Sequence, residues 1–125
     1  MNVYLKSAFQ AKPTFSVVSN LFEKLTELNA APGNEINHGY TFEIFTKHAI
    51  LSRSEDATAH LRSHRYSTGC VITWFNNTPS LEQAAKRAAH ELTDIVTKGE
   101  GTETNIGYGN FSERRFHFVI LSHTR

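Results

Sequence analysis

Two groups of arginines with aromatic neighbours are the residues of this chain best suited to ligand chemistry. They supply seven predicted ligand-binding residues: Arg62, His64, Arg65 and Tyr66 in the first group, and Tyr108, Arg114 and Arg115 in the second. Arginine binds phosphate or carboxylate through a planar fork of donors, and an aromatic ring offers a surface on which a nucleobase stacks. If the two groups meet in the fold, they predict a pocket for a small anionic, nucleotide-like ligand.

Histidine-based or metal-assisted chemistry is the first alternative. The chain has seven histidines, and histidine is a common metal ligand and acid–base group. His60 and His64 have the i,i+4 spacing of one helix face, but Leu61 stands where the zinc-protease motif needs glutamate. We therefore predict no metal site and no cofactor, and keep a histidine-based hydrolase or phosphoesterase, with or without a metal, as the alternative function.

Nucleophilic catalysis has less support. The chain has no Gly-x-Ser-x-Gly motif. The single cysteine, Cys70, lies in a strand-like run, where we expect it to act as a small buried apolar residue. Gly107 and Gly109 lack the third glycine of a dinucleotide-binding loop. Because no nucleophile–base pair is evident, we name no catalytic residue and expect sequestration or sensing of the ligand.

Composition sets the broad class of the protein. The chain has 125 residues and 39% hydrophobic residues, which predicts a single globular domain over residues 1–125. The net charge of +1 argues against a generic DNA-binding protein, which is normally strongly basic. One cysteine excludes an internal disulfide, and no apolar run is long enough to cross a bilayer. We therefore expect a cytoplasmic protein with no membrane partner.

The N-terminal half predicts a strand, a helix and a second strand. Residues 3–9 alternate weakly, as a strand does. Thr14 or Ser16 can cap a helix that the sequence Ala31-Pro32-Gly33 ends. The apolar stripe of this helix is expected to contain Phe15, Val18, Leu21, Phe22, Leu25 and Leu28. In the next strand, residues 36–44, the side chains of Ile36, Tyr40, Phe42 and Ile44 are expected to share one face.

The C-terminal half predicts a central strand and the helix that covers it. Residues 67–75 are rich in β-branched and aromatic residues, as strands are. Ser80 and Gln83 have the spacing of a capping box at the start of the helix. The apolar positions that follow with helical period are Leu81, Ala84, Ala85, Ala88, Leu92, Ile95 and Val96. Further strands are expected at 49–51, 102–108 and 115–122.

These elements predict an α+β fold, a mostly antiparallel sheet of five to six strands with two helices on one face, in the order β-α-β-β-β-α-β-β. Oligomerisation is a simple way to cover the other face, so we expect a homo-oligomer. The leading hypothesis is a small regulator or inhibitor that binds a nucleotide-like anion; one encoded by a virus or mobile element would fit it. A structural or protein-interaction subunit of an oligomer is the second alternative.

Overall fold

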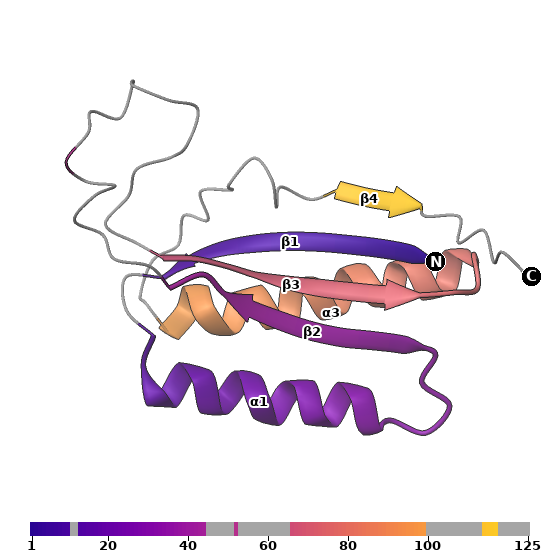
Figure 1. The fold of residues 1–125 in the computed structure, drawn as a ribbon. Helices are drawn as coiled ribbons and strands as arrows, with labels where there is room; N and C mark the ends of the chain where they lie inside the picture. Colours follow the sequence, from indigo (N-terminus) through magenta and orange to yellow (C-terminus); the bar gives the residue numbers. More distant parts are fainter. Residues whose placement is uncertain (11–12, 45–51, 53–65, 100–113, 118–125) are drawn as a thin grey trace, which may run out of the picture.

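The computed structural model describes residues 1–10, 13–44, 52, 66–99 and 114–117 (Figure 1). For 9–10, 66–67 and 114–117 it describes the backbone only. The strands expected at 49–51 and 102–108 lie outside the described residues.

The described residues form two helices and a sheet of four antiparallel strands. In chain order the elements are β1 (Asn2–Gln10), α1 (Phe15–Ala30), β2 (Ile36–Phe42), β3 (Tyr66–Trp74), α3 (Pro79–Gly99) and β4 (Arg114–His117). The α+β class is therefore confirmed. Among the described residues the order is β-α-β-β-α-β, with four strands. The expected total of five to six strands and the full expected order are not shown, because the further expected strands fall outside the described residues.

The strand order across the sheet is β2-β3-β1-β4. Because β3 pairs antiparallel with both β1 and β2, the strands β1 and β2 run parallel with β3 between them. This is the split β-α-β arrangement of ferredoxin-like folds. That fold carries many unrelated functions, so function has to be argued from a site.

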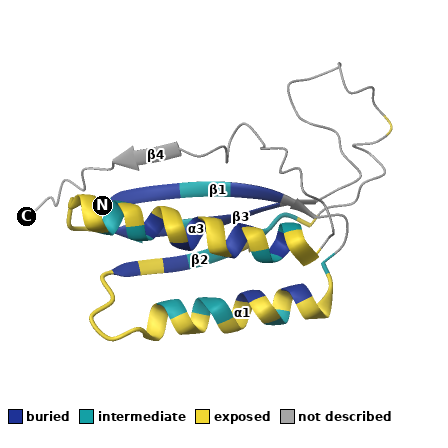
Figure 2. Ribbon diagram, turned by 180° about the vertical axis from the view of Figure 1, so that it is seen from behind, coloured by how far each residue is buried: buried dark blue, intermediate teal, exposed yellow. Residues whose placement is uncertain are grey.

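Both helices pack on one face of the sheet. Helix α3 lies across β1 and β3, whereas α1 lies beside α3 and next to the edge strand β2 (Figures 1 and 2). The register explains which strand residues meet the helices: Ile72 lies opposite both Tyr4 and His38, so all three share a face. The largest buried side chains of this core are Trp74, Leu21, Ile72, Leu92 and Val96.

Helix α1 begins where the sequence predicts, but it buries a different face. The Thr14 hydroxyl accepts a hydrogen bond from the Val17 backbone N–H at 3.3 Å, which confirms Thr14 as the cap. Val17 and Leu21 are buried, whereas Phe15 and Phe22 are 90% and 71% exposed. The predicted stripe is therefore partly wrong. The physical reason is that, among the described elements, α1 packs on α3 and β2 alone, so these cover a narrow sector of the helix.

Helix α3 begins two residues earlier than the capping-box prediction, which placed the cap at Ser80. Pro79 is its first residue, and the Thr78 hydroxyl accepts from the Leu81 N–H at 3.4 Å. Thr78 is thus the cap and the Ser80–Gln83 capping box is wrong, because proline suits the first helical position and places the residue before it at the cap. The predicted apolar positions of α3 are confirmed as buried or packed against the core.

Alternation along β2 is confirmed up to the end of the strand. Ile36, Tyr40 and Phe42 pack in or against the core. Ile44 lies beyond the end of β2 and is 64% exposed, so its predicted place on that face is wrong. None of the helices in the described ranges combines the length and apolar character that crossing a membrane requires.

Candidate functional site

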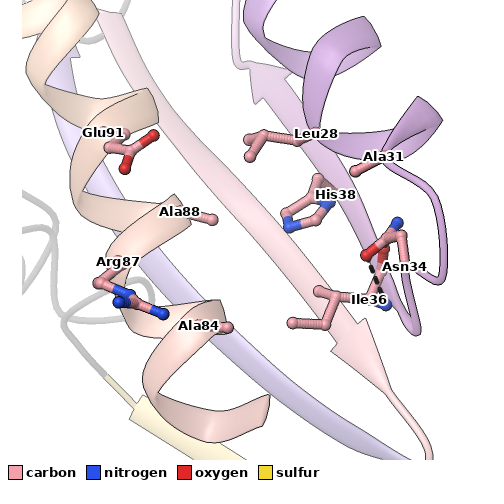
Figure 3. Close-up of a pocket in the computed structure, with 9 residues that line it drawn as sticks. All are labelled: Leu28, Ala31, Asn34, Ile36, His38, Ala84, Arg87, Ala88 and Glu91. Carbon is pink, nitrogen blue, oxygen red and sulfur yellow. Dashed lines mark hydrogen bonds between the residues drawn. The ribbon is translucent and has the colours of Figure 1, made fainter. Parts of the chain in front are cut away.

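A cleft of about 280 Å³ opens between α1, α3 and β2 (Figure 3). Its apolar lining consists of Leu28, Ala31, Ile36, Ala84 and Ala88. Its polar lining consists of Asn34, His38, Arg87 and Glu91. The alanines of α3 leave room at the point where a larger side chain would fill the space between the two helices. The cleft therefore combines an apolar interior with four polar groups, which is the usual composition of a small-molecule site.

His38 is held in the cleft by the side chain of Asn29. The Asn29 Oδ1 accepts from the His38 backbone N–H at 2.9 Å, and the Asn29 Nδ2 donates to the His38 carbonyl oxygen at 2.9 Å. The imidazole Nδ1 lies 3.0 Å from the same Oδ1. His38 is only 7% exposed, and Figure 3 shows its ring pointing from β2 toward α3. A helix residue thus fixes both the backbone and the ring of a strand residue.

Burial keeps the His38 imidazole neutral. Removal from water disfavours the charged form, so the pKa of His38 lies below its ordinary value of 6.5. At neutral pH the ring therefore carries one proton and one lone pair. A neutral, oriented imidazole can accept a proton or a hydrogen bond from a ligand in the cleft.

Helix α3 contributes the charged groups of the cleft. Glu91 forms an ion pair with Lys24 of α1, with 3.0 Å between the carboxylate oxygen and Nζ. Lys24 also pairs with Glu27 at 3.2 Å. These two carboxylates raise the pKa of Lys24 above its usual value. Within the described part of the chain, the Arg87 guanidinium has no ion-pair or hydrogen-bond partner. Arg87 is therefore the cation that remains available to an anion at the cleft.

The Asn34 side chain hydrogen-bonds both backbone groups of Ile36, as the Asn29 side chain does for His38. Its side-chain amide donates to the Ile36 carbonyl oxygen, and its Oδ1 accepts from the Ile36 N–H at 3.0 Å. Since β2 is an edge strand of the described sheet, these outward-pointing backbone groups have no strand partner among the residues that the structure describes. The two asparagines thus occupy the edge of β2 beside the cleft and protect it from pairing with another strand.

The predicted arginine groups lie mostly outside the described residues. Arg62, His64, Arg65 and Tyr108 have no described position. The backbone of Tyr66 pairs with Gln10 of β1, whereas Arg114 and Arg115 pair with Leu5 and Tyr4. Tyr66 and Arg114 thus lie on opposite sides of β1 and five residues apart along it, which is about 17 Å at the rise of a strand. The predicted pocket stays a prediction.

Cys70 is confirmed as a buried apolar residue. It is 0% exposed, and burial raises its pKa to about 11. Its thiol donates weakly to the Lys6 carbonyl oxygen at 3.5 Å. The thiolate, which is the reactive form, is therefore nearly absent at neutral pH. Across the described ranges, no three side chains of histidine, cysteine, aspartate or glutamate gather as a metal-binding group.

Sequence reasoning missed Asn34 and Arg87, which line the cleft, and Asn29, which holds His38 from beside it. A signal for His38 was present, because it occupies an inward position between Ile36 and Tyr40 in an alternating strand. A polar residue at such a position is either a satisfied core residue or part of a site. No comparable pattern marks Asn29 or Arg87, whose roles depend on packing between elements.

Comparison with known proteins assigns no family to the chain. A scan against protein-family models finds no match, and searches of the curated proteins and of the solved structures return no significant similarity. The function therefore has to be argued from the cleft itself.

Proposed function

We propose that the protein is a binding module for a small anionic ligand, held at the cleft between α1, α3 and β2. The observation that carries this proposal is the Arg87 guanidinium, which has no partner among the described residues and lines the same cleft as a buried, oriented imidazole. A guanidinium binds phosphate or carboxylate through paired hydrogen bonds. The apolar lining then accommodates the uncharged body of the ligand.

Local charge supports an anion rather than a cation. Glu91 is the one carboxylate that lines the cleft, and its charge is balanced by Lys24 at 3.0 Å. Lys24 also pairs with Glu27 at 3.2 Å, so the two cations Lys24 and Arg87 and the two carboxylates balance. The support for an anion is that Arg87 has no carboxylate partner within the described residues. The volume of about 280 Å³ is at the lower end for ligand sites, so the ligand is small or inserts only one part of itself.

The proposal also covers the type of ligand, what the protein does with it, and the oligomeric state. The ligand is nucleotide-like, and it is sequestered or sensed. The predicted residues Arg62, His64, Arg65, Tyr66, Tyr108, Arg114 and Arg115 are kept as a separate proposed pocket, because β4, which carries the last two, lies at the opposite edge of the sheet from the cleft. The protein acts as a homo-oligomer in the cytoplasm. Sedimentation equilibrium with and without ligand measures the oligomer directly, and a monomer in both conditions would remove this part.

Isothermal titration calorimetry tests the proposal with nucleoside monophosphates, orthophosphate and short carboxylic acids as probes. At least one probe is expected to bind, and Arg87→Ala is expected to weaken it by tenfold or more, since charge-assisted bonds contribute about 1.5–3 kcal/mol. Lys86→Ala is the matched control, because Lys86 is the neighbouring exposed cation and pairs with Glu82 at 3.1 Å. Equal binding by wild type and Arg87→Ala would contradict the assignment to this cleft.

A second comparison separates the cleft from the arginine group at residues 62–66. If Arg65→Ala abolishes binding while Arg87→Ala does not, the anion is bound by the first arginine group and not by the cleft. Loss in both variants would show one extended site. In either case, binding of a probe supports the proposal that the protein is a binding module for an anion. If no probe binds, the proposal is overturned.

An enzyme is the second candidate function, and the His38–Asn29 contact at 3.0 Å favours it. A histidine oriented by an asparagine is the base half of a nucleophile–histidine–asparagine arrangement. Within the described ranges the only thiol is Cys70, which is buried and protonated, so His38 would activate water. Incubating a bound phosphate ester with the protein and following it by ³¹P NMR tests this. Turnover that His38→Gln abolishes would establish hydrolysis.

A further inference from the structure

We infer that the ligand of this cleft carries two groups: an anion for Arg87, and an N–H or O–H donor for the Nε2 atom of His38. The inference rests on the proposed function and narrows it to a class of ligands. Members of this class include hydroxy acids, amino acids and nucleotides whose base has an N–H. Simple anions that have no N–H or O–H donor do not belong to this class of ligands.

The position of the imidazole proton follows from the backbone of His38. Its N–H needs an acceptor and its carbonyl oxygen needs a donor, and Asn29 supplies both at 2.9 Å. This pairing settles which end of the Asn29 amide is oxygen, and the oxygen is the atom that lies 3.0 Å from Nδ1. Two acceptors cannot share that contact, so Nδ1 carries the proton. The other nitrogen, Nε2, therefore has a lone pair.

Nothing in the described part of the chain satisfies that lone pair. The contacts of His38 are its bonds with Asn29 and its strand pairing, and no hydrogen-bond partner is found at Nε2 among those residues. The side chain is more than nine-tenths buried and its ring points into the cleft (Figure 3). Nε2 is not among the fully buried atoms without a partner, so water reaches it in the free protein. A ligand that offers a donor pairs this atom, whereas one that lacks a donor displaces the water without replacing its hydrogen bond. Sites built around such a bond reject the analogue without the donor.

Charged groups around His38 are consistent with the acceptor state. Arg87 and Glu91 of α3 line the same cleft, and Lys24 of α1 balances Glu91. Burial lowers the pKa of His38, so the neutral ring persists at neutral pH. Below its pKa the ring becomes a donor at both nitrogens, and the preference for donor-bearing ligands is lost.

Two pairs of probes isolate the donor. The first pair is lactate and 2-methoxypropanoate; the second is uridine 5′-monophosphate and its 3-methyl derivative, which lacks the base N–H. Calorimetry at pH 7.5 is expected to show at least tenfold tighter binding of the donor-bearing member in one pair. His38→Phe is expected to equalise the pair, and Asn29→Asp is expected to weaken the preference, because a carboxylate at Nδ1 favours the protonated ring. Circular dichroism melts confirm that both variants fold.

The proton position has a readout that needs no ligand. Two-bond ¹H–¹⁵N correlation spectra of the free protein are expected to show His38 protonated on Nδ1 and bare on Nε2. A proton on Nε2 would overturn the inference. Equal affinities within both pairs, with Arg87→Ala still weakening them, would overturn it and leave the proposed function standing. No binding of any probe would overturn both.

Discussion

Cys70 on the central strand β3 and His38 on the edge strand β2 face the same pair of helices, yet their environments differ. Cys70 is flanked by a strand on each side, with Lys6 on β1 and Tyr40 on β2 as its register partners. Helix α3 covers it, with the Ala89 carbonyl oxygen 4.0 Å from the sulfur. Among the described residues, His38 has a strand on one side only, and on the other side it meets α1.

This difference decides which residue is available for chemistry. A central strand under a helix is enclosed on all sides, and burial there raises the pKa of Cys70 to about 11 and keeps it inert. The edge strand β2 lies next to the cleft between α1 and α3. An inward-facing residue of β2 such as His38 therefore lines the cleft. In a sheet with two covering helices, sites on this face are therefore favoured at the edge, where α1 and α3 diverge.

The largest expected effect belongs to the central strand. Trp74→Ala removes a side chain that is 1% exposed, and the free energy of unfolding is expected to fall by about 3–5 kcal/mol. Phe75→Ala, at the next position, removes a ring that is 72% exposed and is expected to change stability by less than about 0.5 kcal/mol. Urea unfolding followed by circular dichroism measures both. Similar losses would mean that Phe75 is covered in solution.

A smaller effect is expected at the edge strand. Asn29→Ala removes three contacts to His38, and we expect a loss of about 1–2 kcal/mol, because the freed backbone groups regain water at the sheet edge. Asn20→Ala on the exposed side of α1 is the control and is expected to be neutral or slightly stabilising, since alanine favours helices. An Asn29→Ala protein as stable as wild type would show that the contact does not hold β2 to α1.

The smallest expected effects are changes of stability with pH. His38 on β2 affects stability at acidic pH, and Cys70 on β3 affects it at alkaline pH. His38 has a lowered pKa in the folded protein, so the unfolded chain binds more protons below about pH 6.5 and stability falls there. Cys70 has a raised pKa, so the unfolded chain loses its proton first and stability falls between about pH 9 and 11. Urea midpoints across pH, with His38→Phe and Cys70→Ala as the respective controls, test each limb. If the acidic loss of stability persists in His38→Phe, or the alkaline loss persists in Cys70→Ala, that loss is caused by another titrating group.

Much of the fold follows from local patterns. Alternation located β2, apolar periodicity located α3, and the cap of α1 is Thr14, one of the two predicted candidates, because each feature depends on neighbours within a few residues. Errors arose where two local solutions competed. Thr78 and Ser80 both offer a hydroxyl near Pro79, and the hydroxyl before the proline is the one that caps. The exposure of Phe15 and Phe22 was not predictable from α1 alone, because it depends on how little of the helix its neighbours cover.

The sequence by itself determined the α+β class, the positions of both helices and the central place of β3, since these depend on periodicity, capping and burial along the chain. Only the tertiary structure decided where a site lies. Asn29, His38 and Arg87 come from three different elements. Their meeting depends on α1 packing beside α3 at the edge of the sheet, and no spacing within the sequence encodes that geometry.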